Sequence, residues 1–271
     1  SACLVGSEMC IRDRFLFAGT DLFFCSAFGD VWFLAHTSAV CFTLLALYEL
    51  TGRKRGWLVA LWAVCAFESR FALVVVLPVY AWLLWRSDRR AVRSFLLLLV
   101  PVALAWVGYN ELRWGTIHDI GYTTWFHRDV QAGEPYGSPF QLKFLPMQLY
   151  SFFVLPPDVG RGYPYLAPSL IGTALTWTSP ALVLAFLARR PVPLVGAMWA
   201  ATLLASAPNF VYYVNGVSQF GMRHALDFEP FLFVLMILAA TPKLPVWSAA
   251  LCLYSACVGV WGTWFWDTFY R

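Results

Sequence analysis

The sequence predicts an all-α polytopic membrane protein, a bundle of about eight spans with one long extracytoplasmic loop carrying short surface helices. Of its 271 residues, 60% are hydrophobic and 13% are charged, and the mean hydropathy is +0.64. A soluble domain has about 45–50% apolar and about 25% charged residues, and a soluble fold of this length could not bury the excess. The chain also holds 14 Trp, which is typical of side chains at membrane–water interfaces.

The apolar residues are concentrated in eight segments. Some are shorter than the ~20 residues that a straight span needs, but short or broken spans are tolerated where they line a protein cavity. The count of spans is therefore about eight. The segments run roughly over 31–50, 57–68, 71–85, 95–109, 177–187, 193–207, 228–241 and 246–265.

Lys and Arg assign the loops between these segments to two sides. Basic residues gather in short stretches at 51–56, 86–93, 189–190 and 243. If the chain crosses the membrane at every segment, these stretches all share one side, which the positive-inside rule makes cytoplasmic. The intervening loops then hold most of the acidic residues on the other side. We expect a multi-pass protein of a bacterial cytoplasmic membrane.

The loop at about 110–176 is too long for a simple turn. It is rich in proline and aromatic residues, and its middle, 142–155, is apolar but interrupted. A disordered segment contains few aromatic residues. We therefore expect short helices lying along the membrane surface.

The first residues differ from the rest of the chain. Residues 1–14 read SACLVGSEMCIRDR, and their last six back-translate to a sequence resembling a transposase adapter used for sequencing libraries. We therefore expect 1–14 to be a non-native, adapter-derived segment outside the fold, and 15–271 to be a transmembrane domain that lacks its N-terminal spans. The alternative is a native polar N-terminus.

The cysteine and histidine residues form no recognisable metal or disulfide pattern. The seven Cys include no CxxC pair, and the four His have no metal-ligand spacing. The sequence also lacks the glycine-rich nucleotide motifs and the HExxH zinc motif. We expect neither a metal nor a cofactor.

Ionisable groups beside apolar segments are candidate functional residues, because charge is costly at membrane depth. Asp30 and His36 lie at the extracytoplasmic mouth of the first segment. Asp30 is a candidate for the site, or it caps a helix while His36 packs inside. Arg70, in the Glu68-Ser69-Arg70 turn, could bind a phosphate bidentately, or the turn merely keeps its charges in water.

A third cluster, residues 219–230, runs directly into an apolar segment. It contains Arg223, His224 and Asp227. Because Asp227 follows Arg223 by four residues, the two could pair on one helix face. The density of charge at the membrane boundary favours a functional site over a solvated helix cap.

Three stretches together resemble the GT-C superfamily of membrane glycosyltransferases, most closely bacterial proteins similar to dolichyl-phosphate-mannose–protein mannosyltransferases. Residues 29–85 place an Asp before a Leu-rich span, then a basic turn and Glu-Ser-Arg. Residues 109–115, followed by 121–122, resemble a YN-x-x-R-[FW]-G … GY pattern, and 219–230 resemble G-x-R-[YH] … D-x-x-P. The likeness covers nearly all of 15–271, and the order and spacing of the motifs are its stronger part.

The resemblance implies transfer of a sugar from a polyprenyl-phosphate carrier to an extracytoplasmic acceptor with inversion. An acidic residue would act as base on the acceptor hydroxyl, and basic residues would stabilise the leaving phosphate. Asp30 matches the family's second acid, while the principal catalytic acid would precede residue 15 and be lost. The implied site therefore consists of Asp30 as the catalytic residue, with donor-phosphate binding by Arg70, Arg223, His224, Asp227 and His36.

Two other functions remain open from the residues alone: a transporter or flippase for a lipid-linked or small polar substrate, and a non-catalytic membrane fragment. Transporters place charges near the midplane of internally repeated halves, whereas here the charges cluster on one side and no repeat is visible. We expect Asp30, Arg70 and Arg223 to converge on one extracytoplasmic cavity near His224 and Asp227. The alternative is separate local ion pairs, such as Glu68 with Arg70.

Overall fold

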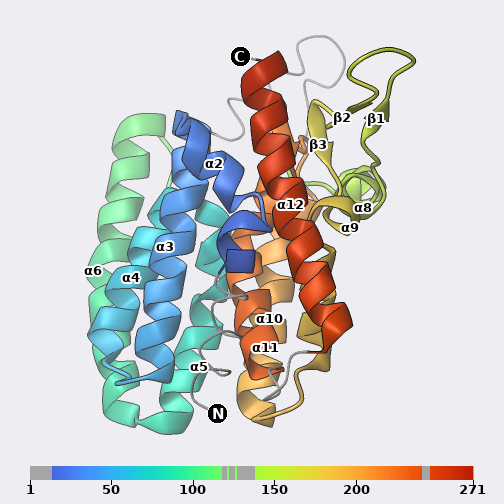
Figure 1. Cartoon of the computed structure of the whole chain (residues 1–271). Coiled ribbons are helices and arrows are strands. Elements are labelled where there is room, and N and C mark those ends of the chain that lie inside the picture. The colour runs from blue at the N-terminus through green and yellow to red at the C-terminus, as the bar shows by residue number, and fades with distance from the viewer. Residues whose placement is uncertain (1–13, 118–120, 122–125, 127–137, 240–244, 271) are drawn as a thin grey trace.

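The computed structural model describes residues 14–117, 121, 126, 138–239 and 245–270. Its helices run up and down a single bundle, with the described parts of the long loop gathered at one end (Figure 1). The segment expected to be non-native, 1–14, lies outside the described residues except for Arg14, as do Tyr122 and Lys243.

The first half of the chain is a run of antiparallel helices. Helix α3 begins after Asp30, whose extended backbone follows Gly29 at φ 62°, and α3 packs along α4. The elements are α2 (Leu22–Phe28), α3 (Val31–Thr51), α4 (Gly56–Ser69), the 3₁₀ helix η1 (Phe71–Val76), α5 (Leu77–Ser87) and α6 (Arg89–Trp114).

The second half begins with the long loop and ends in three helices. Its helical elements are η2 (Leu142–Phe144), α8 (Leu145–Phe153), α9 (Leu175–Thr178), η3 (Pro180–Leu187), α10 (Val192–Phe210), η4 (Arg223–Asp227), α11 (Glu229–Leu238) and α12 (Val246–Phe269). Two small sheets connect them. Strands β1 (Asp158–Val159) and β2 (Leu166–Ala167) form an antiparallel hairpin, and β3 (Ile171–Thr173) pairs in parallel with β4 (Gln219–Gly221).

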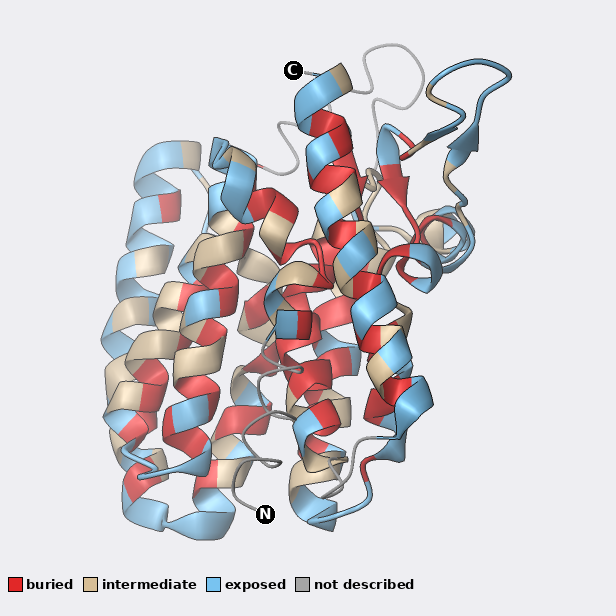
Figure 2. Ribbon diagram, viewed as in Figure 1, coloured by how far each residue is buried: buried red, intermediate tan, exposed pale blue. Residues whose placement is uncertain are grey.

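Three helices among the described residues are long and apolar enough to cross a membrane: α3, α6 and α12. Helix α6 lies at the edge of the bundle, and much of its surface is exposed (Figure 2). Only 11% of its most apolar stretch is buried, and Leu97 and Leu104 are among its exposed side chains. The other expected segments are also helical, but α4 and α11 are shorter. The expected segment 177–187 is split between α9 and η3, because Pro180 begins a new helical element.

The three basic turns within the described residues share one end of the bundle, as the Lys and Arg pattern predicts. Lys54, in the turn after α3, donates a hydrogen bond from Nζ to Oγ of Ser87, the last residue of α5, at 2.5 Å. The turn before α10 lies at the same end, while the β1–β2 hairpin lies toward the other (Figure 1). The short surface helix α8 confirms that the long loop contains helix, although the same loop also forms strands.

Small residues let the helices approach closely in the core. Ala60, Ala185 and Ala201 are fully buried between their neighbours, and a Cβ on Gly56 would lie 1.8 Å from the carbonyl oxygen of Ala91. Close backbone approach through small residues is the common packing mode of membrane helices. It fixes α4 against α6, and with them the turn that carries Arg70.

The orientation of the bundle can be tested by labelling. In a cysteine-free background, Gly162→Cys in the β1–β2 hairpin should react with a membrane-impermeant maleimide on intact spheroplasts. Gly52→Cys in the first basic turn should react only after permeabilisation, because the positive-inside rule places it in the cytoplasm. Equal labelling of both positions on intact spheroplasts would reject the assignment.

Candidate functional site

A buried ion pair between Arg70 and Asp227 lies at the centre of the candidate site. Arg70 Nε donates to Asp227 Oδ1 at 3.0 Å and Nη2 donates to Oδ2 at 2.8 Å, so the pair is bidentate. The two side chains are 15% and 0% exposed. Arg70 lies in extended backbone between α4 and η1, and Asp227 ends η4, so the contact joins elements 157 residues apart.

Asp227 has further partners that hold its negative charge. Asn209 Nδ2 donates to Oδ2 at 2.9 Å, and His36 Nδ1 lies 3.6 Å from Oδ1, a close contact but longer than a hydrogen bond. Burial is the largest single influence and would raise the pKa of Asp227, but Arg70 and His36 together outweigh it and hold that pKa well below its usual value. Asp227 is therefore ionised.

His224 extends the cluster from the other side of Arg70. Its Nδ1 lies 3.0 Å from Arg70 Nη2, and since a guanidinium can only donate, Nδ1 accepts and the ring is neutral. Burial, followed by the charge of Arg70, lowers the pKa of His224 well below its usual value. The proton on Nε2 is then available as a donor. The ring of His36 packs edge-on against that of His224 at 5.4 Å.

Arg223 differs from Arg70 because no described carboxylate lies within ion-pair distance of it. Its guanidinium lies 5.5 Å from the centre of the Phe33 ring, a cation–π contact. Arginine keeps its proton in proteins. Because Asp227 balances Arg70 and His224 is neutral, the described cluster retains the positive charge of Arg223.

The basic side chains of this cluster line one cavity of about 860 Å³. These basic side chains, which we call the cationic layer after its two arginines, are His36, Arg70, Arg223 and His224. Aromatic residues form the outer rim, where Trp32 is 65% exposed. The rim consists of Trp32, Phe140, Tyr212 and Tyr213. Val74, Val75, Leu204 and Ala207 form an aliphatic part of the wall.

The three layers follow the bundle axis in order. Helix α3 passes from Trp32 at the rim to His36 one turn further in, and η1 passes from Arg70 to Val75 in the same direction. Helix α10 runs the opposite way, from Leu204 up to Asn209. The cavity is therefore aromatic at its mouth, cationic in the middle and aliphatic within the bundle.

The structure brings together most of the residues that the sequence selected, but not all of them. Arg70, Arg223, His224 and His36 share the cavity, and Asp227 lies against them. Asp30 is apart: its side chain is exposed before α3, makes no capping hydrogen bond and does not line the cavity.

Neither of the two alternative local ion pairs is present among the described residues. Arg70 pairs with Asp227 rather than with Glu68, and Arg223 stacks on Phe33 rather than pairing with Asp227. The second motif also lies elsewhere. It ends α6 at Gly115, where Arg113 stacks on the ring of Trp114 at 4.8 Å.

Asp21 is a buried carboxyl group that the sequence did not single out. It is 4% exposed, and its Oδ1 accepts a hydrogen bond from Gly221 N at 3.1 Å, directly before the Arg223 segment. Burial raises the pKa of Asp21 to about 7. In sequence, an acidic residue before a short apolar stretch is typical of a solvated loop. Only the tertiary contact with β4 shows that Asp21 is buried. Asn209 lies in α10, two residues beyond the expected apolar segment 193–207, and the sequence did not single it out either.

The Arg70–Asp227 pair should dominate the stability of the site. Arg70→Met alone should lower the free energy of unfolding by about 3–5 kcal/mol, because it leaves Asp227 buried and unpaired. Adding Asp227→Leu should restore much of that loss. Thermal unfolding of both variants in detergent measures this; additive losses in the double variant would show that the pair is not coupled.

Asp21 should make stability depend on pH in a defined direction. Because the pKa of Asp21 is higher in the folded than in the unfolded chain, its protonated carboxyl stabilises the fold fully below about pH 4, the usual Asp pKa. That stabilisation is lost as the pH rises to about 7. Asp21→Asn keeps an acceptor oxygen and cannot ionise. Its melting temperature relative to the parent should therefore rise between about pH 5 and pH 7 and then level off. A pH-independent difference would show that Asp21 is not buried as described.

The cavity can bind an elongated molecule with a polar end, an anionic middle and an apolar tail. No described group of three or more His, Cys, Asp or Glu side chains is placed to hold a metal ion. Compared with known proteins, the chain matches no family model, no curated protein and no solved structure.

Proposed function

We propose that the chain acts as a membrane glycosyltransferase, which passes a sugar from a polyprenyl-phosphate donor to an extracytoplasmic acceptor with inversion. The observation that carries the proposal is the layered cavity, with aromatic, cationic and aliphatic zones in that order. A glycosyl phosphate on a prenyl tail has the same three zones in the same order. The proposal includes about eight spans in a bacterial cytoplasmic membrane, with the rim on the extracytoplasmic side.

The cationic zone supports a phosphate ligand over a neutral one. Arg223 lacks a described carboxylate partner, and a cation at this depth is stabilised by a bound anion. As the bond to the sugar breaks, charge accumulates on the leaving phosphate, so the guanidinium contacts strengthen in the transition state. His224 adds a neutral Nε2–H donor, and Asp227 holds Arg70 in a fixed orientation.

A lipid-linked donor also fits the position of the cavity. Nucleotide sugars are not available on the extracytoplasmic side, whereas a polyprenyl phosphate keeps its tail in the bilayer and its phosphate at the interface. Aromatic faces at the rim, such as Trp32 and Tyr212, suit the apolar face of a sugar ring.

Asp30 has a different part in this scheme. It lies two residues before Trp32 but outside the cavity, so it would act on the acceptor hydroxyl or orient the acceptor rather than bind the donor phosphate. Asp30→Asn should therefore reduce sugar transfer while leaving donor binding unchanged. A loss of donor binding in Asp30→Asn would contradict this role.

Arg223 provides the sharpest test of the phosphate site. Arg223→Gln should weaken binding of undecaprenyl phosphate to the purified protein in nanodiscs by about tenfold or more, because one charge-assisted contact is lost. Arg223→Lys should retain part of the affinity. Transfer of mannose from undecaprenyl-phosphate mannose in membranes should fall by about a hundredfold in Arg223→Gln, comparable to loss of an oxyanion donor.

The matched control is Arg113→Gln, because Arg113 also stacks on an aromatic ring but lies outside the cavity. It should leave binding unchanged. If both glutamine variants bind as the parent does, the phosphate site is rejected. If the parent binds the lipid phosphate and moves it across proteoliposomes without transferring sugar, the chain is a flippase.

A further inference from the structure

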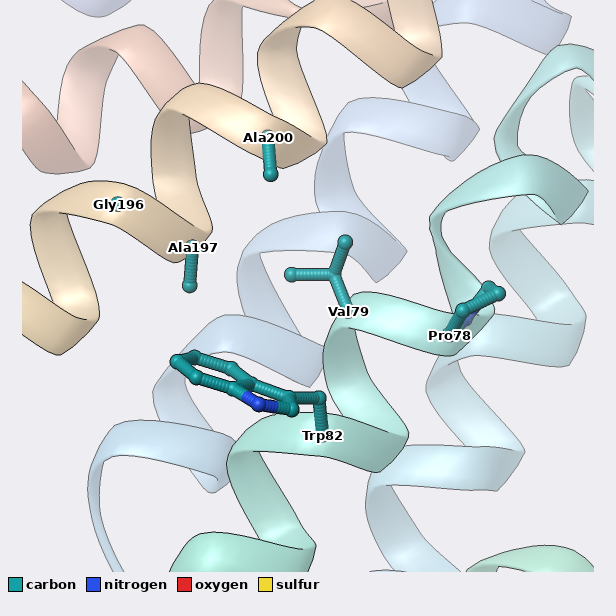
Figure 3. Close-up of a pocket in the computed structure, with 6 residues that line it drawn as sticks. All are labelled: Pro78, Val79, Trp82, Gly196, Ala197 and Ala200. Atoms are coloured by element: carbon teal, nitrogen blue, oxygen red, sulfur yellow. The ribbon is translucent and has the colours of Figure 1, made fainter.

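A second cavity, of about 370 Å³, lies between α5 and α10. Pro78, Val79 and Trp82 line it from α5, facing Gly196, Ala197 and Ala200 of α10 (Figure 3). None of these side chains is charged, so the cavity suits an apolar group. We refer to it as the α5–α10 pocket.

The pocket continues the aliphatic end of the cationic cavity. The same two stretches of chain line both: Val75 and Val79 are one helical turn apart, and so are Leu204 and Ala200. On α10, the residues that line the two cavities run from Pro208 to Gly196. These positions are twelve residues apart, which corresponds to roughly 18 Å along the helix at ~1.5 Å per residue. The two cavities therefore follow one another along a single seam.

The pocket is open on the α10 side because Gly196 has no side chain to fill it. A Cβ built on Gly196 would meet no atom within 4 Å, so the glycine is not required for close packing there. Trp82 forms the opposite wall, and the Arg86 guanidinium lies over its ring, 5.2 Å from the ring centre. Arg86 belongs to a basic turn, so the pocket lies toward the end of the bundle opposite the aromatic rim.

We infer that the α5–α10 pocket holds the isoprene units that lie within roughly 18 Å of the phosphate at Arg70 and Arg223, and so selects against tails too short to reach it. This inference rests on the proposed function. It accounts for the direction of the seam, which leads from the cationic layer into the bundle. It also accounts for the apolar lining, since each isoprene unit removed from water or lipid needs only shape-matched apolar contact.

Filling the pocket tests the inference. Gly196→Leu places a side chain in open space, so the helix should fold while the pocket closes. Binding of undecaprenyl phosphate should weaken by about tenfold, whereas geranyl phosphate, whose tail is too short to reach Ala200, should bind as before. Trp82→Ala, which widens the pocket, should reduce the discrimination between the two lipids.

The matched control is Gly108→Leu on α6, because a Cβ there also meets nothing within 4 Å and Gly108 lines neither cavity. It should change neither affinity. The inference is overturned if Gly196→Leu leaves undecaprenyl phosphate binding unchanged, or weakens both lipids equally. It is also overturned if native mass spectrometry shows that Gly196→Leu displaces a phospholipid instead. Failure of the parent to bind either phosphate would reject the proposed function itself.

Discussion

The buried pairing of Arg70 with Asp227 is the contact on which the rest of the site depends. Removing two charges from water is costly, and only bidentate geometry with additional hydrogen bonds offsets the cost. Here the additional donor is Asn209 on α10, so one carboxylate connects the turn after α4, the end of η4 and the upper part of α10. These elements come from opposite halves of the chain. The pair therefore fixes how the two halves meet, and the cavity lies where they meet.

The pair also explains why two arginines of one cavity have different roles. Arg70 is neutralised and oriented by Asp227, whereas Arg223 is placed by an aromatic ring and by the β4 strand that precedes it. A cation on an aromatic face keeps its charge available to a ligand, and no described carboxylate lies within ion-pair distance of Arg223. The site thus combines a fixed structural charge with one that remains for binding.

Much of the fold could be predicted from the sequence, because burial in lipid or protein leaves a strong compositional signal. The described parts of all eight apolar segments are largely helical, and the three basic turns that the structure describes share an end. Helix lengths were less predictable: Pro180 at the start of η3 splits the expected segment 177–187, and the expected segment 71–85 begins as the 3₁₀ helix η1 before α5. Only α3, α6 and α12 among the described helices are both long and apolar enough to cross a membrane by themselves.

The candidate site was predictable in its members but not in its contacts. Charges beside apolar segments pointed to Arg70, Arg223 and His224 and to a shared cavity, but local spacing suggested no partners beyond ion pairs within each cluster. The actual partner of Arg70 is 157 residues away, and no local pattern encodes such a contact. Asp21 escaped notice for the same reason, since its burial arises from β4 packing over it. Asp30 was selected by its position before a span, which does not determine the direction of its side chain.

The parallel pairing of β3 with β4 couples the long loop to the cationic layer. Register in this short sheet is set by two partner pairs, Ile171 with Gln219 and Thr173 with Gly221, and Arg223 follows two residues after Gly221. A slip of one residue would reverse which face each side chain occupies and would withdraw Arg223 from the cavity. The position of the Arg223 charge therefore depends on the register in which the long loop pairs, through β3, with β4.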